Sequence, residues 1–372
     1  MSLYCNKQSG LKKIIVSVTN DLTSDQRVDK VCNTLHNGGY EVLLIGKKNK
    51  NSKAFHRNYA TKRFNQFFQK GVLFYAEFNL RLFFFLLFSK KTILLANDLD
   101  TLMPNYLVAK LQRKKVVFDS HELFSEIPEL VHRPFVKKIW TLLENWMLPN
   151  LKNTYTVCDS IALYYANKYA SKFKVIRNLP IYKNSQFRGE FLFNTSEKKV
   201  ILYQGAVNVG RGLELMIDTL AFLPNCIFVV IGTGDILKEL KTLIINKNLG
   251  DRIKLLGQIS PQKLHTITPL AHLGISLEED LGLNYRFALP NKIFDYIQAE
   301  VPVLVSDLPE MKKIVSDYKV GEVVFNRTPK TLAQQIEKIL KKNFATALKT
   351  AKKDLIWEHQ EQDLRAIFEN IH

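Results

Sequence analysis

Short runs of β-branched and aliphatic residues alternate with helical patterns along the chain, and this alternation limits the possible folds more than any other feature. The segment 25–39, for example, places apolar residues at helical spacing between two such runs and ends on two glycines. The strand-like runs of the first half are KKIIVSVTND (12–21), YEVLLIG (40–46), TILLAND (92–98), KVVFDSHE (115–122), NTYTVCD (153–159) and KVIRNLP (174–180). Such alternation predicts a parallel sheet with helices on both faces.

The same pattern restarts after a polar, irregular stretch from Phe187 to Lys199, which we interpret as a linker. The second set of strand-like runs is KVILYQG (199–205), CIFVVIGTGD (226–235), IKLLGQI (253–259), LGISLEE (273–279), VPVLVSD (301–307) and GEVVF (321–325). A chain of 372 residues is also long for a single core. We therefore predict an α/β protein with two Rossmann-like, doubly wound domains, at 1–180 and 181–355.

The chain is strongly basic, with 53 Lys and Arg against 35 Asp and Glu, a net charge of +18. This charge favours anionic partners such as nucleic acid, acidic lipid or phosphorylated substrates. Between Val42 and Ala76 there are eight Lys and Arg residues and no acidic one, which is typical of a solvated face. No basic-aromatic motif of a nucleic-acid recognition module is visible, so nucleic acid is not the expected partner.

The cysteines Cys5, Cys32, Cys158 and Cys226 are scattered singly. This spacing indicates a reducing cytoplasm, with neither a disulfide framework nor a zinc site. Lys12 and Lys13 lead directly into the first strand-like run, which does not resemble a signal peptide. We expect a cytoplasmic protein.

The densely apolar segment FNLRLFFFLLFSKK (78–91) has two interpretations. Its uninterrupted run Leu82–Phe88 is shorter than the ~20 residues of a spanning helix. It is either a buried helix of the first domain or, given the adjacent basic stretch, a helix on an anionic membrane surface. The sequence favours neither.

The stretch YQGAVNVGRGLEL (203–215) links a strand to a helix and contains three glycines and Arg211. Phosphate binding by backbone N–H groups needs glycine and a helix N-terminus, both of which this stretch offers. It matches neither the dinucleotide nor the P-loop fingerprint, and a tight turn explains its glycines equally well. Arg211 favours the phosphate interpretation, because a guanidinium is a fork suited to a diphosphate.

Two later loops follow strands on the same predicted sheet, and ligands of open α/β sheets bind at such strand ends. GTGD (232–235) opens a helix, and LEEDLGLNYRFALPNKIFDY (277–296) contains several charged residues. A carboxylate at the start of the following helix is able to bind a ribose diol, or it simply complements the helix dipole.

Together these motifs resemble the nucleotide-sugar glycosyltransferases of family 4 (glycosyl transferases group 1), of the bacterial type. Arg211-Gly212 stands at the family's Lys-Gly position, Gly232 and Gly234 match its G-x-G, and DYIQAEVPVLVSDLPEM (295–311) matches its closing run. The resemblance implies the GT-B architecture, two Rossmann-like domains facing across a cleft. It also implies that residues 356–372 form a helix that packs back on the first domain.

Two departures from the family pattern affect the donor site. The family's first loop arginine is Ala206 here, and its Glu-x7-Glu pair has Phe287 at the first position. Asp295 matches the second acid, which implies ribose binding, and Glu278 is a candidate replacement for the first. PNKIFDY (290–296) resembles a variant in which Lys292 adds positive charge near the phosphates.

The resemblance then assigns roles to individual residues. It implies catalytic roles for His121, Arg211 and Lys292, although a lone histidine is as often structural. The implied donor-binding residues are Gly205, Gly210, Gly212, Gly232, Gly234, Glu278, Asp295 and Asn178, the last in the crossover IRNLP (176–180). The implied acceptor-binding residues are Asp21, Gln26 and Arg27.

The implied reaction is transfer of a sugar, with retention, from a nucleoside diphosphate sugar to an acceptor hydroxyl. We expect that no Asp-x-Asp metal motif follows a strand. We therefore expect no cofactor and no metal, with positive side chains neutralising the leaving diphosphate. The expected partners are a nucleotide sugar, a saccharide or lipid-linked acceptor and, if 78–91 touches lipid, the inner face of the cell membrane. The expected process is synthesis of a cell-surface polysaccharide or glycolipid. A non-hydrolysing sugar-nucleotide epimerase and a basic nucleic-acid or anion-binding protein remain alternatives.

Overall fold

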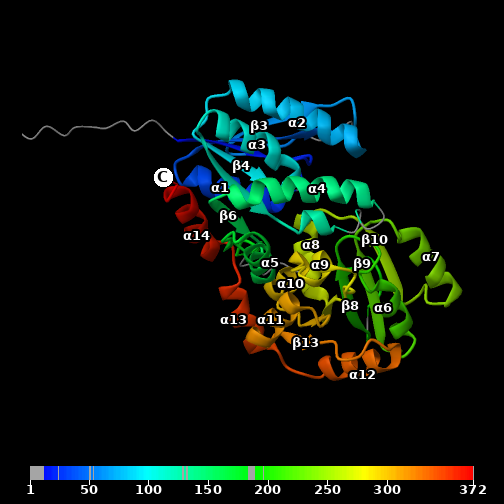
Figure 1. The fold of residues 1–372 in the computed structure, drawn as a ribbon. Helices are drawn as coiled ribbons and strands as arrows, with labels where there is room; N and C mark the ends of the chain where they lie inside the picture. Colours follow the sequence, from blue (N-terminus) through cyan, green and yellow to red (C-terminus); the bar gives the residue numbers. More distant parts are fainter. Residues whose placement is uncertain are drawn as a thin grey trace, which may run out of the picture. The chain divides into compact units, whose positions relative to one another are not determined.

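A computed structural model describes residues 12–23, 25–49, 52, 54–127, 130, 133–182, 189–195 and 197–371. The chain divides into two compact units, which are described separately (Figure 1). Unit 1 comprises residues 1–177 and 360–372, and unit 2 comprises residues 178–359.

Unit 1 is built on a parallel sheet with strand order β3-β2-β1-β4-β5-β6-β7. The strands are β1 (Lys13–Ser17), β2 (Glu41–Lys48), β3 (Ala60–Asn65), β4 (Ile93–Asn97), β5 (Lys115–Ser120), β6 (Asn153–Thr156) and β7 (Lys174–Val175). In the centre, Ile15 lies opposite Leu43 of β2 on one side and Leu94 of β4 on the other. This is the doubly wound order, in which the chain leaves β1 first in one direction and later in the other.

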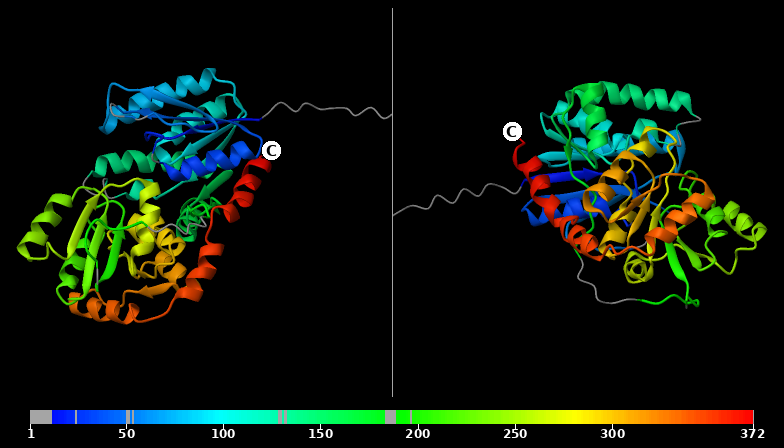
Figure 2. Two further views of the ribbon diagram at one scale, coloured as in Figure 1. Left: turned by 180° about the vertical axis from the view of Figure 1, so that it is seen from behind. Right: turned by 90° about the horizontal axis from the view of Figure 1, so that it is seen from below.

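Helices cover both faces of this sheet. They are α1 (Gln26–Asn37), α2 (Gly71–Phe88), α3 (Leu99–Leu111), α4 (Pro134–Met147), α5 (Asp159–Tyr169) and the C-terminal α14 (Glu358–Glu369). The Asp25 carboxylate caps α1 by accepting from the backbone N–H of Val28, at 3.0 Å. Figures 1 and 2 show α2 beside α3, both packed on the face that contains Ile15 and Leu94. On α14, Glu361 accepts from Thr34 of α1 at 3.0 Å, so the end of the chain packs on unit 1.

Unit 2 repeats the same topology, with strand order β10-β9-β8-β11-β12-β13. The strands are β8 (Lys199–Gln204), β9 (Cys226–Ile231), β10 (Ile253–Gly257), β11 (Leu273–Ser276), β12 (Val303–Val305) and β13 (Gly321–Val323). The helices are α6 (Leu213–Leu220), α7 (Leu237–Asn246), α8 (Pro261–Ile267), α9 (Leu283–Arg286), α10 (Asn291–Gln298), α11 (Pro309–Tyr318), α12 (Pro329–Ile339) and α13 (Ala345–Asp354). Two apolar clusters, one on each face of the sheet, bury most of the central strands β8, β9, β11 and β12, whereas the edge strands β10 and β13 are only partly buried. The prediction of two doubly wound α/β domains is therefore confirmed.

The structure adds one strand that the sequence analysis missed. β3 lies inside the basic stretch, where Lys62 and Arg63 interrupt any apolar run. It is the edge strand of its sheet and pairs only with β2 among the described strands. Charged side chains on an edge strand hinder pairing with other chains, so its composition reflects its position.

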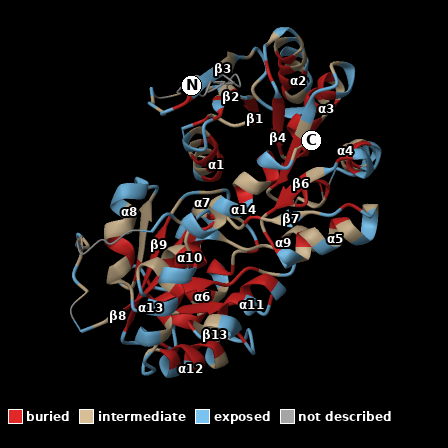
Figure 3. Ribbon diagram, turned by 90° about the vertical axis from the view of Figure 1, so that its left-hand side faces the viewer, coloured by how far each residue is buried: buried red, intermediate tan, exposed pale blue. Residues whose placement is uncertain are grey.

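The apolar segment forms most of α2, an 18-residue helix that is only partly buried. Figure 3 shows buried red and exposed pale blue residues along it, whereas the central strands are red. Among the described residues α2 is the one helix long and apolar enough to cross a membrane, by length and composition only. The interpretation of 78–91 as a buried helix of the first domain holds for one face only, because Phe78, Leu82 and Leu86 are buried whereas Leu80, Phe84 and Phe88 are exposed.

Three cysteines in the described residues, Cys32, Cys158 and Cys226, are buried and form no disulfide. Cys5 lies outside the described residues. Part of the predicted linker, including Phe187, also lies outside them.

Candidate functional site

In each sheet the loops that follow the two central strands lie at the point where the strand order reverses, the usual ligand position in this architecture. In unit 2 these are the loop 205–212 after β8 and the loop 277–282 after β11. In unit 1 they are the loop 18–25 after β1 and the start of α3 after β4. Six of the residues implied by the family resemblance lie in these loops: Gly205, Gly210, Arg211, Gly212, Glu278 and Asp21.

The glycines of the 205–212 loop permit close packing against the neighbouring loop. Gly210 and Gly212 have positive φ values of 76° and 70°, which favour glycine. A Cβ on Gly212 would lie 2.3 Å from the carbonyl oxygen of Leu277, and one on Gly210 would lie 2.5 Å from Leu281 Cδ1. These two glycines are thus required by the contact between the loops, whether or not a ligand binds.

The glycines after β9 pack against the same loop from the other side. A Cβ on Gly232, whose φ is 149°, would lie 1.8 Å from the carbonyl oxygen of Gly205. A Cβ on Gly234 would lie 2.2 Å from Asn208 Oδ1. The five predicted donor-binding glycines therefore belong to one packed set of loops.

We expect Gly232→Ala to destabilise unit 2 by about 1–3 kcal/mol, because the added methyl overlaps a backbone carbonyl that cannot move without shifting β8. Gly250→Ala is the matched control, since a Cβ there meets nothing within 4 Å. Urea unfolding of the two variants measures the difference. Equal stability of both variants would contradict the proposed packing.

Three charged side chains meet beneath these loops. Lys292, at the start of α10, donates from Nζ to Glu278 Oε1 at 2.7 Å, and Arg211 Nη1 lies 3.6 Å from the same oxygen. Ser276 Oγ donates to the other carboxylate oxygen of Glu278 at 2.7 Å. Lys292 also lies against Gly205, whose hypothetical Cβ would be 3.5 Å from Lys292 Cε. Lys292 thus lies beside Gly205, the residue before Ala206, where the family pattern has its first arginine.

The three side chains of this trio differ in charge and in exposure to solvent. Glu278 is completely buried; burial acts to raise its pKa, but Lys292, Ser276 and Arg211 outweigh burial and keep the pKa below its ordinary value. Lys292 is 8% exposed, whereas the Arg211 side chain is 25% exposed. Two cations against one carboxylate leave one positive charge. Arg211 is the cation that reaches solvent.

The Arg211 guanidinium is held on several sides yet keeps an unused donor. It lies over the Tyr285 ring, 5.1 Å from the centroid, and Tyr285 in turn donates to the carbonyl of Val209 at 2.9 Å. Its buried Nε has no hydrogen-bond partner among the described residues. An unpartnered buried donor is costly, and an anion at this position would satisfy it.

Asp295 and Asn178 lie near the trio but have other partners. Asp295 Oδ2 accepts from Gln204 Nε2 at 3.0 Å, and Gln204 also accepts from Thr268 at 2.9 Å. Asn178 donates from Nδ2 to Asn291 Oδ1 at 3.0 Å. The roles of Asp295 and Asn178 in donor binding stay predictions, as does a direct contact between Glu278 and a donor.

The sequence analysis missed Arg327, which follows β13. Its guanidinium donates to Ser306 Oγ at 2.9 Å and to the carbonyl of Leu277 at 3.0 Å, so it ties the 277–282 loop to the end of β12. No local pattern distinguishes Arg327 from other surface arginines, because its partners are 21 and 50 residues away.

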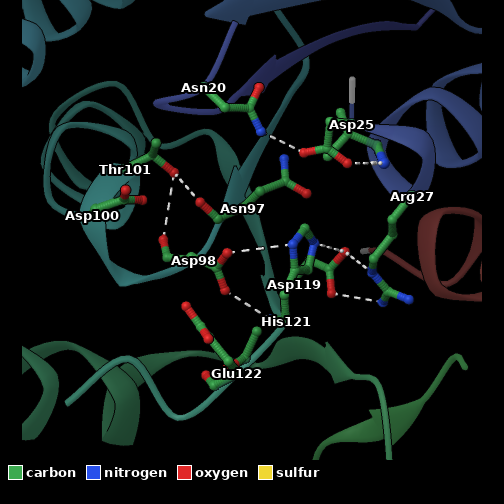
Figure 4. A network of polar contacts seen from close by, with 12 residues as sticks. Asn20, Asp25, Arg27, Asn97, Asp98, Asp100, Thr101, Asp119, His121 and Glu122 are labelled. Atoms are coloured by element: carbon green, nitrogen blue, oxygen red, sulfur yellow. Dashed lines mark hydrogen bonds and ion pairs between the residues drawn. The ribbon is translucent and has the colours of Figure 1, made fainter. Parts of the chain in front are cut away.

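The second group of predicted residues forms a network at the end of the unit 1 sheet (Figure 4). The buried Arg27 guanidinium binds both carboxylate oxygens of Asp119, at 2.8 and 3.1 Å, and donates to the Ile176 carbonyl at 2.8 Å. His121 Nε2 lies 2.9 Å from Asp119 Oδ2, and His121 Nδ1 lies 3.3 Å from Asp98 Oδ2. Both ring nitrogens of His121 therefore face a carboxylate.

This arrangement holds His121 as an imidazolium. Burial acts to lower the pKa of His121, but Asp119 and Asp98 outweigh burial and raise the pKa to about 9. Burial likewise acts to raise the pKa of Asp119, yet Arg27 and His121 lower it to about 2. Burial raises the pKa of Asp98 to about 7 against the opposing charge of His121. An imidazolium between two carboxylates has no free nitrogen to accept a proton.

We expect the stability of unit 1 to fall as the pH rises from about 6.5 through about 9. The pKa of His121 is raised from 6.5 to about 9, so its contribution to stability is complete below 6.5 and is lost as the pH rises through 9. Thermal melting across this range, in wild type and in His121→Gln, measures the effect. The slope should be shallower in the variant; an identical slope would contradict the clamp.

Asp98 holds an unusual backbone conformation, with φ 57° and ψ 167°. This region is rare for any residue except glycine and costs about 1–3 kcal/mol. The conformation lets Asp98 Oδ1 accept from the backbone N–H of His121 at 2.7 Å while Oδ2 faces the ring. The Asp98 carboxylate thus contacts both the backbone and the ring of His121.

Asp98 and Asp100 form an Asp-x-Asp sequence directly after β4, so the expectation that no such motif follows a strand is wrong. The two carboxylates have different partners, since Asp100 Oδ2 accepts from Thr19 Oγ1 at 2.5 Å. Burial raises the pKa of Asp100 to about 7. In the described part of the chain, no group of three or more His, Cys, Asp and Glu residues is placed to hold a metal ion.

The predicted acceptor residues are not equally placed. Gln26 is exposed at the start of α1, whereas Arg27 is 4% exposed and holds Asp119. Asp21 is paired with Arg63, at 3.1 Å, and accepts from Ser52. A direct contact of any of the three with an acceptor stays a prediction.

The strand order and the strand-end sites of both units define a known class of fold. A sucrose-phosphate synthase from Thermosynechococcus elongatus has a similar structure, with a TM-score of 0.76, 17% identity, and coverage of 97% of this chain and 99% of that one. HepE from Anabaena, in complex with UDP and glucose, has a TM-score of 0.71 with 14% identity, covering 97% and 100% of the two chains. The chain has the GT-B glycosyltransferase fold.

Residues 187–354, almost all of unit 2, match the family described as glycosyl transferases group 1. An α-D-kanosaminyltransferase from Streptomyces kanamyceticus is 26% identical over 155 residues. That match spans 40% of this chain and 38% of the relative's length. The family match does not favour the epimerase or the nucleic-acid-binding alternative.

Proposed function

We propose that this protein is a retaining glycosyltransferase that moves a sugar from a nucleoside diphosphate sugar to an acceptor hydroxyl. The observation that carries the proposal is the surplus positive charge of Arg211 and Lys292 over Glu278 at the strand-end site of unit 2. The family match covers the same residues, and HepE, of similar fold, was solved with UDP and glucose.

In this mechanism, negative charge develops on the departing diphosphate while the sugar carbon becomes electron-poor. Arg211 donates to the diphosphate oxygens with its exposed N–H groups, and Lys292 adds charge from below the Gly205 loop. Glu278 is a positioning residue, since it holds both cations without neutralising them fully. The front-face route, in which the leaving phosphate helps to deprotonate the acceptor, needs no protein base, in agreement with a His121 that is already protonated.

The strand-end site of unit 1 suits a polyhydroxyl acceptor. Its partly exposed groups include Asn20, Asp98 and Glu122, and amides and carboxylates bind sugar hydroxyls. An uncharged saccharide or the sugar of a lipid-linked carrier fits this chemistry. We place the reaction in the cytoplasm, in the synthesis of a cell-surface polysaccharide or glycolipid.

Donor binding is the direct test of this function. UDP-, GDP- and dTDP-sugars are screened by thermal shift, and each sugar that stabilises the protein is incubated with saccharide acceptors. NMR of the product then reports the anomeric configuration. Stabilisation by one donor and a product with the donor's configuration are expected; an inverted product would overturn the retaining mechanism, and the absence of any stabilising donor would overturn the function.

We expect EDTA to leave transfer unchanged, because positive side chains supply the charge that a divalent ion supplies elsewhere. Asp98→Asn is the companion measurement, since Asp98 belongs to the Asp-x-Asp sequence. Loss of activity in EDTA, restored by Mg²⁺ or Mn²⁺, would show that the proposed metal independence is wrong.

A further inference from the structure

The outward face of α2 is an apolar surface that no described residue of unit 1 covers. It comprises Val72, Leu73, Leu80, Phe84 and Phe88, with Phe67 just before the helix. The exposed fractions of Leu80, Phe84 and Phe88 are 59, 50 and 82%. Along the helix Leu73, Leu80, Phe84 and Phe88 recur at intervals of seven and four residues, so they lie on one side. A soluble surface helix normally carries polar residues on this side.

The opposite face fixes α2 to unit 1. Phe78, Leu82 and Leu86 are completely buried, in the cluster that contains the central strands. The buried Asn79 donates from Nδ2 to the carbonyl of Asp100 at 2.9 Å, and so ties the helix to the start of α3. To span a bilayer, α2 would have to leave this core. A helix about 27 Å long that lies flat on the domain presents its outer side along its whole length.

Basic side chains border the apolar face. Lys62 Nζ lies over the Phe85 ring, 4.3 Å from the centroid, and Lys47 Nζ lies over the Phe74 ring at 4.6 Å. Arg81 is on the helix itself, with its guanidinium 5.5 Å from the Phe67 ring centroid. Lys70 and Lys90, just beyond the two ends of α2, are exposed.

Acidic residues are almost absent from this region. Between Val42 and Asn97 the sequence contains one, Glu77. Glu77 Oε1 accepts from Arg81 at 2.8 Å, and its carboxylate also accepts from the backbone N–H groups of Phe67 and Phe68. Its charge is therefore engaged locally and does not offset the other cations.

We propose that the α2 face docks on an anionic lipid surface, with the helix axis in the plane of the membrane and Leu80, Phe84 and Phe88 inserted. The charge pattern favours an anionic lipid surface over a second copy of this chain. A second copy would bring two basic borders together, whereas anionic headgroups complement them. The proposal rests on the proposed function in one respect, since docking brings the acceptor-side unit to the membrane where a lipid-linked acceptor resides.

Co-sedimentation with vesicles tests this surface. Wild-type protein is mixed with vesicles of phosphatidylcholine alone or of phosphatidylcholine with phosphatidylglycerol, at low and high salt. The apolar variant combines Leu80→Ser, Phe84→Ser and Phe88→Ser. The matched control combines Ile245→Ser and Phe325→Ser, two exposed apolar residues of unit 2. The charge variant Lys62→Glu with Lys70→Glu is paired with Lys341→Glu and Lys349→Glu.

We expect wild type and both controls to bind the phosphatidylglycerol vesicles, more weakly at high salt. The affinity of the apolar variant for these vesicles should be lower by a factor of roughly ten or more, because burial of one Leu or Phe side chain already contributes that factor. Absence of binding by wild type, or equal binding by wild type and the apolar variant, would overturn the proposal. So would a lipid-free dimer of wild type that the apolar variant loses, because the face would then be a self-interface.

The thermal shift caused by a nucleotide sugar, measured on the same samples, separates the two proposals. It should be equal in wild type and the apolar variant, which also shows that the variant is folded. Vesicle binding without any donor shift would leave the surface standing and overturn the transferase. A thermal shift with a donor but no vesicle binding would overturn the lipid-docking surface and leave the transferase proposal standing.

Discussion

Replacing Arg211 by alanine is expected to lower kcat for sugar transfer by about 100- to 1,000-fold, the loss typical of removing one group that stabilises developing negative charge. Arg211 is the exposed cation of its trio, and its buried Nε has no partner among the described residues. The fold should persist, since Lys292 still pairs with the buried Glu278 after the change. Steady-state kinetics with an identified donor measures the effect.

Two further variants isolate the cause of this loss. Arg286→Ala removes a nearby arginine that is 52% exposed and paired with Asp280, and it should leave kcat unchanged. Arg211→Lys keeps the charge but not the guanidinium fork, so an intermediate rate is expected. Near-wild-type transfer by Arg211→Ala would remove this residue from the mechanism.

Asp119→Asn should lower the free energy of unfolding of unit 1 by about 3–5 kcal/mol, because it leaves buried cations without their counter-ion. Arg27 and His121 both depend on this carboxylate, which is completely buried. Urea unfolding followed by tryptophan fluorescence suits the measurement, since Trp140 and Trp146 belong to unit 1.

The control for this variant is Glu41→Gln, which breaks the exposed pair of Glu41 with Lys13. Surface pairs contribute about 0–1 kcal/mol, so its effect should be small. If Asp119→Asn lowers the free energy of unfolding no more than Glu41→Gln does, the network around Asp119 does not stabilise the end of the sheet. His121→Gln distinguishes the contributions of the two cations, because in this variant Arg27 alone pairs with Asp119.

The topology was accessible from the sequence because it depends on short-range periodicity. Buried parallel strands appear as apolar runs, and the helices between them repeat every three to four residues. The edge strand β3 was not predicted from the sequence, because Lys62 and Arg63 interrupt the apolar pattern in a strand that pairs on one side only. For α2 the composition was clear, but which of its residues are buried depends on α3 and the sheet.

The functional residues were accessible only in part. The positions of Arg211, Lys292 and His121 at strand ends follow from the order of strands and loops along the chain. Their partners do not. Arg211 and Glu278 are 67 residues apart in sequence, and Arg27 and Asp119 are 92 apart. Parallel strands bring such residues together because their carboxyl ends meet at one edge of the sheet.

For the glycine-rich stretch 203–215, the sequence by itself determined the fold around it and the place of Arg211 at its end. Only the tertiary structure decided why its glycines are needed, since a Cβ on Gly212 would meet the Leu277 carbonyl from a distant loop. It also decided that Glu278 holds both cations and that His121 lies between two carboxylates. Local pattern specifies secondary structure, whereas steric contact and charge pairing act across the space that the folded sheet creates.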